Sequence, residues 1–179
     1  MHPTSSYAPA QKALHWLIFL LVIGLYGLTY GEDFFPRGDP GRATIWWLHI
    51  SFGLLLAALV VLRVATRLSL GAPKLPTAMT AMEQKLAHLA HLLLYALLVI
   101  IPLLGIVLTW FRGDALTFFG LFTIPSPVAP DKAVAGVIRE AHSLCANLIL
   151  IVAGLHAVAA LWHHFIRKDD VLRRMLPGT

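Results

Sequence analysis

Four long stretches of the chain carry very few charged residues, and this pattern restricts the possible fold more than any other feature. A helix needs roughly 20 consecutive apolar residues to cross a bilayer. Only 13% of the residues are charged, compared with about a quarter in a soluble domain. We therefore expect an all-α integral membrane protein, a single domain over 1–179 with four transmembrane helices. The expected helices cover about 13–31, 44–66, 86–111 and 138–165.

The placement of basic residues predicts the orientation of this bundle. Positive charge gathers at the N-terminus, in the segment 67–85 and in the C-terminal tail, whereas the loops on the opposite side are slightly acidic overall. Positive charge marks the cytoplasmic side of a membrane, so both termini are expected in the cytoplasm. The tail, 166–179, mixes apolar and basic residues and is expected to lie as a short helix on the inner membrane surface. The net charge of +5 thus indicates contact with membrane lipid and not with nucleic acid.

Two further segments bear on the organisation of the chain. The first hydrophobic stretch is long and lacks a small-residue cleavage site, so we expect it to be a retained span and not a signal peptide. The longest outer loop, 112–136, contains the run FFGLF and three prolines. We expect this loop to fold back onto the bundle as a lid.

All but one of the nine histidines lie in or at the edge of a predicted span. Polar side chains at membrane depth are costly and usually face a partner inside the bundle. His142 and His156 begin and end one apolar run, and helix geometry places them about 21 Å apart on one face. This arrangement suits two flat cofactors that are stacked across a bilayer.

Each of these histidines has a possible partner at the same depth. His49 lies early in a helix that enters from the outer side, as His142 does, and His15 lies near the cytoplasmic side, as His156 does. The two pairs predict two bis-histidine haem sites, because neutral imidazole is a good axial ligand for haem iron. The bundle is therefore expected to enclose two haem b groups. His91 also lies in the inner half and competes with His15 for the inner site.

Other chemistries account for the histidines less well. Zinc is disfavoured because no carboxylate or thiolate stands beside them, and covalent haem is disfavoured because the C-x-x-C-H signature is absent. The single cysteine excludes an internal disulfide. A haem-free protein whose histidines serve transport or packing remains an alternative. Gly53 and Gly154, near two of the histidines, permit close approach either of a ring or of another helix.

A polar group at the cytoplasmic end suggests a second kind of site. His163 lies one heptad beyond His156, on about the same face and nearer the cytoplasm. This position suits a hydrogen bond to a quinone carbonyl and the passage of protons. Gln11, Trp16 and His91 are further candidates for the quinone site, although each is equally well explained as an interfacial polar or aromatic anchor.

Several motifs together resemble the bacterial cytochrome b561 family, and most of all its superoxide-oxidising branch. The resemblance covers nearly the whole chain. It rests on FFPRGD at 34–39, HISFG at 49–53, AHLAHLLLYALL at 87–98, EAHSLCANL at 140–148, GLHAVAALWHHF at 154–165 and KDDVLRRMLP at 168–177.

The resemblance implies a diheme protein of the bacterial inner membrane, in which superoxide is oxidised to dioxygen on the outer side and ubiquinone is reduced on the inner side. It implies haem ligation by His15, His49, His142 and His156, and a quinone near His163. A related bundle also serves as a non-catalytic electron-transfer subunit of dehydrogenases or hydrogenases, which is the alternative function. The chain has no large soluble extension for docking, so no obligate protein partner is expected.

Superoxide is a small anion, and a cluster of cations raises the association rate of such a substrate. Arg37, Arg112, Lys132 and Arg139 are the candidates for this cluster beside the outer pair, His49 and His142. The alternative is that these cations pair with the acidic residues near them in sequence. Those residues are Asp39, Asp114, Asp131 and Glu140.

Overall fold

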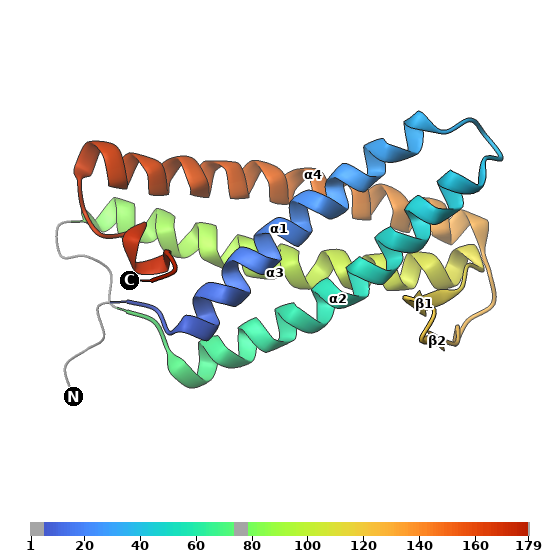
Figure 1. Cartoon of the computed structure of the whole chain (residues 1–179), viewed down its shortest axis with the longest axis horizontal. Helices are drawn as coiled ribbons and strands as arrows, with labels where there is room; N and C mark the ends of the chain where they lie inside the picture. The colour runs from blue at the N-terminus through green and yellow to red at the C-terminus, as the bar shows by residue number, and fades with distance from the viewer. Residues whose placement is uncertain (1–5, 74–78, 179) are drawn as a thin grey trace.

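Four long helices dominate the computed structural model, which describes residues 6–73 and 79–178 (Figure 1). Residues 74–78 of the basic 67–85 segment, and Thr179 of the tail, lie outside the described residues. All four helices are long and apolar enough to cross a membrane, so the chain is a multi-pass membrane protein. The helices are α1 (Pro9–Gly31), α2 (Pro40–Leu70), α3 (Ala81–Arg112) and α4 (Lys132–Trp162).

Each helix begins before the hydrophobic stretch that predicted it, and polar residues cap the first turn of α2, α3 and α4. The Asp39 carboxylate accepts a hydrogen bond from Gly41 N at 2.7 Å, directly before Pro40 opens α2. Thr80 and Glu83 form a capping box at the start of α3. Asp131 accepts bonds from two backbone amides at the start of α4. Hydropathy locates the membrane core of a helix, whereas these caps locate its end.

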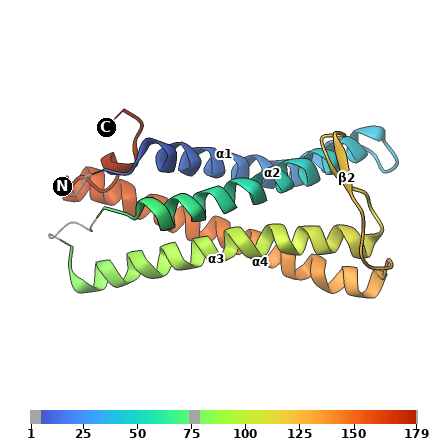
Figure 2. The same ribbon diagram turned by 90° about the horizontal axis from the view of Figure 1, so that it is seen from below.

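The helices form two antiparallel pairs that lie in two layers (Figure 2). The α1 helix packs on α2, and α3 packs on α4, while α2 and α3 join the layers. Among the described residues, the α4 backbone hardly approaches α1 or α2. A central apolar cluster holds the layers together. It includes Ile18, Leu25, Leu56, Val60, Leu97, Leu98 and Ile149.

The outer loop folds back onto the bundle as expected, but it contains a feature that the all-α prediction missed. Strands β1 (Leu116–Phe118) and β2 (Phe122–Ile124) pair as a short antiparallel hairpin that packs against α2. Ser51, which is fully buried on α2, anchors it. The Ser51 hydroxyl donates to Thr117 O at 3.2 Å and accepts from Phe119 N at 3.0 Å.

The chain beyond α4 turns back toward the start of α1, so the tail and the start of α1 lie at the same end of the bundle (Figure 1). A π-helical turn, η2 (His163–Arg167), follows α4, and a 3₁₀ turn, η3 (Arg173–Met175), follows that. The tail is held to α1 by a bond of 2.9 Å from Trp16 Nε1 to Met175 O. The single short surface helix predicted for this tail is therefore replaced by two tight turns.

Candidate functional site

The outer histidines come together from α2 and α4. The ring centroids of His49 and His142 are 6.4 Å apart, and the ring planes are inclined by 68°. The Nδ1 atom of His142 lies 3.1 Å from Ile101 O, a distance that fits donation to this carbonyl. A histidine with its Nδ1–H bonded to a carbonyl presents Nε2 as the free nitrogen, which is the usual arrangement for a metal ligand.

The inner histidines come together from α1, α3 and α4. The centroids of His15 and His156 are also 6.4 Å apart, with an interplanar angle of 76°. His91 lies closer to His156, at 5.2 Å between centroids and 65° between planes. The guanidinium of Arg63 lies beside His15, with Nη2 at 3.2 Å from Nδ1. His15, His91 and His156 are therefore neighbours, and His156 lies against both of the others.

The two separations of 6.4 Å fit a pair of rings that share one metal ion. An imidazole nitrogen lies about 2 Å from the metal that it binds, so the centroids of two such rings are roughly 6 Å apart. The rings of His91 and His156 lie closer together and leave less room for a shared metal ion. Within residues 6–73 and 79–178, no group of three or more His, Cys, Asp or Glu side chains forms a site for a bare metal ion. The donor set suits a metal that brings its other ligands with it, as haem iron does.

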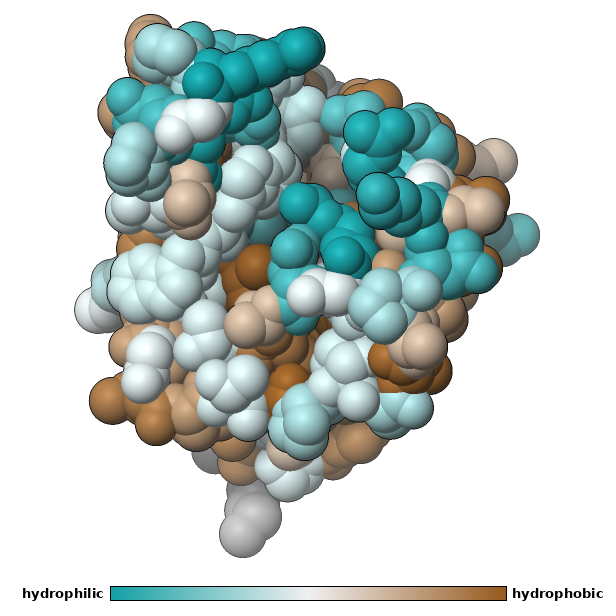
Figure 3. Space-filling view, turned by 90° about the vertical axis from the view of Figure 1, so that its right-hand side faces the viewer, coloured by the Kyte–Doolittle hydropathy of each residue, from teal (hydrophilic) through white to brown (hydrophobic). Residues whose placement is uncertain are grey.

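A cavity of about 1020 Å³ adjoins the outer pair. It reaches the end of the molecule that carries the hairpin, where hydrophilic residues surround a recess that is lined with apolar ones (Figure 3). Gly53 faces this cavity, and a Cβ added there or at Gly154 would meet no atom within 4 Å. Neither glycine therefore mediates a helix–helix contact, and the space in front of Gly53 is open to a large ligand.

Three of the four candidate cations line this cavity, and two of those three are already paired. Arg112 Nε lies 2.9 Å from an Asp114 oxygen, and Arg139 Nη2 lies 3.0 Å from a Glu140 oxygen. Lys132 lines the cavity with no carboxylate within ion-pair distance in the described part of the chain. The remaining candidate, Arg37, lies in the loop before α2 and does not line the cavity. The other predicted acidic partners, Asp39 and Asp131, cap helices instead.

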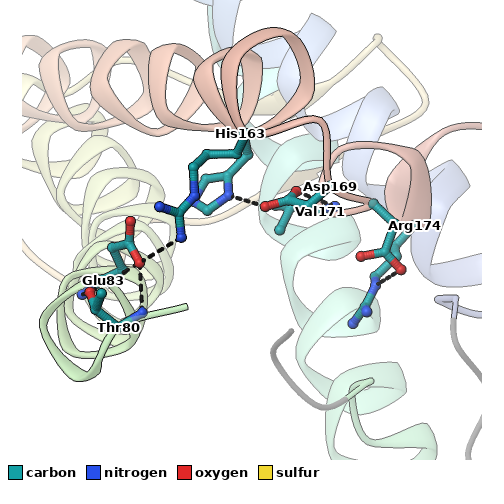
Figure 4. Close-up of polar contacts among 8 residues, drawn as sticks. Thr80, Glu83, His163, Asp169, Val171 and Arg174 are labelled. Atoms are coloured by element: carbon teal, nitrogen blue, oxygen red, sulfur yellow. Dashed lines mark hydrogen bonds and ion pairs between the residues drawn. The ribbon is translucent and has the colours of Figure 1, made fainter. Parts of the chain in front are cut away.

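The quinone-site candidates lie at the opposite end of the bundle. His163 is buried at the start of η2, and its Nδ1 lies 2.5 Å from an Asp169 oxygen (Figure 4). Burial raises the pKa of Asp169, but hydrogen bonds from His163 and from Val171 N outweigh it, so this pKa lies below the usual aspartate value. Lys168, between the two, adopts a left-handed conformation with φ 56°. This tight turn brings the carboxylate back to the ring and leaves Nε2 as the second polar atom of His163.

The polar atoms of Gln11 and Trp16 already bond to the protein itself. Gln11 Nε2 donates to Gly71 O at 2.9 Å, and its Oε1 accepts from Ala8 N at 3.2 Å. Trp16 donates its only N–H to the tail. These two residues therefore shape the region near α1 through the backbone segments that they hold, while His163 is the candidate with a polar atom left for a ligand.

Several residues at these sites carried no recognised signal in the sequence. Gly105, on α3, allows the His142 ring to lie against the helix, because a Cβ there would be 3.2 Å from Cε1. Tyr26 and Asn147 join α1 to α4 across the cavity with a bond of 2.7 Å. Asp169 lies in a charged tail that was interpreted as lipid-facing. Only the KDDVLRRMLP motif includes Asp169, and the motif does not show which side chain the Asp169 carboxylate contacts.

Comparison with known proteins gives one consistent result. Residues 6–178 match the family model described as prokaryotic cytochrome b561. The chain is 34% identical over 172 residues to a probable superoxide oxidase CybB of Yersinia pestis, covering 96% of each chain. It is 30% identical over 171 residues to cytochrome b561 homolog 1 of Escherichia coli K12, covering 96% of this chain and 97% of the relative. It is 31% identical over 176 residues to a cytochrome b562 of Cereibacter sphaeroides, covering 95% and 94%.

Proposed function

The chain belongs to the prokaryotic cytochrome b561 family, and from that membership we propose a superoxide:ubiquinone oxidoreductase with two haem b groups. As a family member it is a membrane electron-transfer protein of the b-type cytochromes. The finer proposal places His49 and His142 on the outer iron and His15 and His156 on the inner iron. The name of the Yersinia pestis relative supports superoxide as the electron donor.

One observation carries this proposal: two histidine pairs have the same centroid separation of 6.4 Å, and α4 supplies one member of each. A chance cluster of hydrogen-bonding histidines has no reason to repeat one spacing at two depths. Haem bound at each pair supplies one-electron chemistry, which none of the protein side chains at these sites offers. The pairing of His15, rather than His91, with His156 is supported by its wider spacing.

At the outer end, the chain must attract a small anion and admit it to the cavity. Lys132 is the cation at the cavity that lacks a carboxylate partner among the described residues, so it makes the largest contribution to this attraction. Arg112 and Arg139 contribute less, because Asp114 and Glu140 offset their charge. Two superoxide anions each lose one electron and leave as dioxygen.

At the inner end, the same two electrons and two protons convert ubiquinone to ubiquinol. We assign the hydrogen bond to a quinone carbonyl to His163 Nε2–H of a doubly protonated ring, whose Nδ1–H the Asp169 carboxylate accepts (Figure 4). The Asp169 carboxylate can exchange a proton with the ring at Nδ1, while Val171 N in the tail holds its second oxygen in place. The proposed orientation puts this end and both termini in the cytoplasm, in agreement with the basic residues around it.

The decisive experiment mixes pulsed superoxide with the purified, oxidised protein and follows the haem absorption bands. We expect rapid reduction, then reoxidation when ubiquinone is added. His142→Ala should lose the outer haem and the reaction with superoxide but keep the inner haem, and His156→Ala should lose the inner haem. His91→Ala is the matched control and should keep both. Reduction that persists in His142→Ala at the wild-type rate would contradict the proposed electron route.

The same preparation tests the alternative functions. A redox protein that co-purifies at fixed stoichiometry, together with no reduction by superoxide, would favour an electron-transfer subunit. A dithionite-reduced sample without a b-type absorption band would leave a haem-free protein as the explanation.

A further inference from the structure

Arg63 is a cation in the membrane-spanning part of α2 that has no carboxylate partner within residues 6–73 and 79–178. It is half-buried and lies beside the inner histidines. Its Nη1 donates to Gln11 O at 3.2 Å, and its guanidinium lies 5.7 Å from the centroid of the Tyr95 ring. A charged side chain at membrane depth is costly without a counter-ion, so these neutral partners leave its charge uncompensated.

The acidic residues at this end are all engaged elsewhere. Glu83 pairs with Arg167, Asp169 with His163, and Asp170 with Arg174 (Figure 4). The described part of the protein therefore offers Arg63 no free carboxylate, and the missing anion must come from a bound molecule. Arginine is well suited to this role because its planar, forked donors match a carboxylate or phosphate in geometry.

The contact between Arg63 and His15 is incompatible with metal binding by His15. Arginine only donates hydrogen bonds, so His15 Nδ1 must accept in this contact. A neutral imidazole that accepts at Nδ1 carries its one proton on Nε2, and a protonated nitrogen does not bind a metal. When His15 binds iron through Nε2, its Nδ1 becomes a donor and no longer accepts from Arg63. The guanidinium must then turn to another acceptor.

We propose that Arg63 is the counter-cation for a propionate carboxylate of the inner haem, and that it leaves His15 when that haem binds. The inference rests on the proposed function, since it requires a haem at the inner pair. Arg63 thereby serves two states of one site. Without haem it bonds to the His15 ring, and with haem it neutralises the cofactor's own charge. An anionic lipid phosphate has the same chemistry, but it lies at the membrane surface, nearer to Arg67 one turn further along α2.

The test uses the full chain in nanodiscs of zwitterionic lipid, in a His142→Ala background that leaves only the inner site. Apo-protein is titrated with protohaem and with its dimethyl ester, which has no carboxylates. Arg63→Gln should weaken protohaem binding roughly tenfold to a hundredfold, the usual contribution of a hydrogen bond to a charged group. In the protein that keeps Arg63 (the Arg63 chain), esterification should weaken haem binding by a similar factor. In Arg63→Gln, esterification should change haem binding little. Arg67→Gln, the matched control, should bind protohaem as the Arg63 chain does.

Each other outcome has a defined meaning. Equal losses on esterification in the Arg63 and Arg63→Gln chains would overturn the proposal, because the carboxylate would then not depend on Arg63. The proposal also fails if esterification leaves haem binding by the Arg63 chain unchanged. This part of the experiment requires no substitution at position 63. In a parallel series of nanodiscs with added anionic lipid, haem binding that follows the lipid content and not esterification would assign Arg63 to lipid phosphate and refute the proposal. Absence of any inner haem from the Arg63 chain would instead refute the proposed function.

Resonance Raman spectra provide a second readout that does not depend on activity. The propionate bending band of the inner haem should shift between the Arg63 chain and Arg63→Gln. Arg63→Lys, which keeps a point charge without the forked donors, should give an intermediate shift. An unchanged band in all three proteins would contradict the proposed contact.

Discussion

Replacement of Gly105 by alanine should selectively weaken the outer haem site. A Cβ at this position on α3 would lie 3.2 Å from His142 Cε1 and 3.6 Å from its Nδ1. The ring cannot simply withdraw, because the same Nδ1 bonds to Ile101 O one turn earlier on α3. The added methyl group therefore presses on a ring whose other edge must remain free for a ligand.

The substitution has two opposing effects on the stability of the helix, and only one of them bears on haem affinity. Alanine is favoured over glycine within a helix by about 0.5–1 kcal/mol. Overpacking a tight contact costs about 1–3 kcal/mol, because neighbours leave their preferred positions. Helix propensity acts equally with and without haem, so only the strain on the ring changes haem affinity. The contact at 3.2 Å involves a ring held from both sides, and about 1 kcal/mol of strain in the haem-bound position is roughly a fivefold loss of haem affinity.

Haem titration of the apo-protein, with electron paramagnetic resonance to separate the two low-spin signals, measures this change. Gly24→Ala is the matched control. Gly24 is exposed within α1, and a Cβ there meets no atom within 4 Å, so helix propensity alone should act and haem binding should not change. The reasoning would be refuted if Gly105→Ala had the same outer-haem affinity and the same signals as Gly24→Ala.

Three further substitutions test other parts of the structure. Ser51→Ala leaves a backbone donor and acceptor of the hairpin without their partner, so stability should fall by about 1–3 kcal/mol and hydrogen exchange in the hairpin should rise, unless water replaces the hydroxyl. Asp169 has a lowered pKa in the folded state, so its stabilising effect is present above the usual aspartate pKa and disappears as the pH falls through the lowered value. The protection factors of the tail amides, corrected for the intrinsic exchange rate at each pH, should therefore fall on acidification in the wild type and be low at all pH values in Asp169→Asn. Lys132→Gln should slow reduction by superoxide severalfold at low salt and less at high salt, whereas Arg139→Gln should have a smaller effect because Glu140 already offsets that charge.

The fold was largely predictable because the membrane imposes it. Burying some 20 residues of backbone in hydrocarbon requires helices, and hydropathy alone therefore located all four. The hairpin was missed because its strands have three residues each, and its pairing depends on Ser51, which is far away in the sequence. The turn η2 was missed because its conformation depends on the contact between His163 and Asp169, which a local pattern does not reveal.

The site was predictable in outline but not in its supporting contacts. Helix periodicity was sufficient to put His142 and His156 on one face, since both lie on a single helix. The neighbours of the rings depend instead on how separate helices pack. Gly105 against His142 and Arg63 against His15 are contacts of this kind, and no spacing within one segment encodes them.

The α4 helix supplies one ligand to each of the two proposed redox centres. His142 and His156 belong to one uninterrupted helix, so their separation of about 21 Å along its axis does not depend on how the other helices move. Their partners His49 and His15 come from the α1–α2 layer, whose backbone hardly approaches α4. Movement between the layers would therefore change both ligand pairs without changing the length of the path between them. For the proposed function, this division means that only the α1 and α2 ligands would move relative to α4, while His142 and His156 keep their separation.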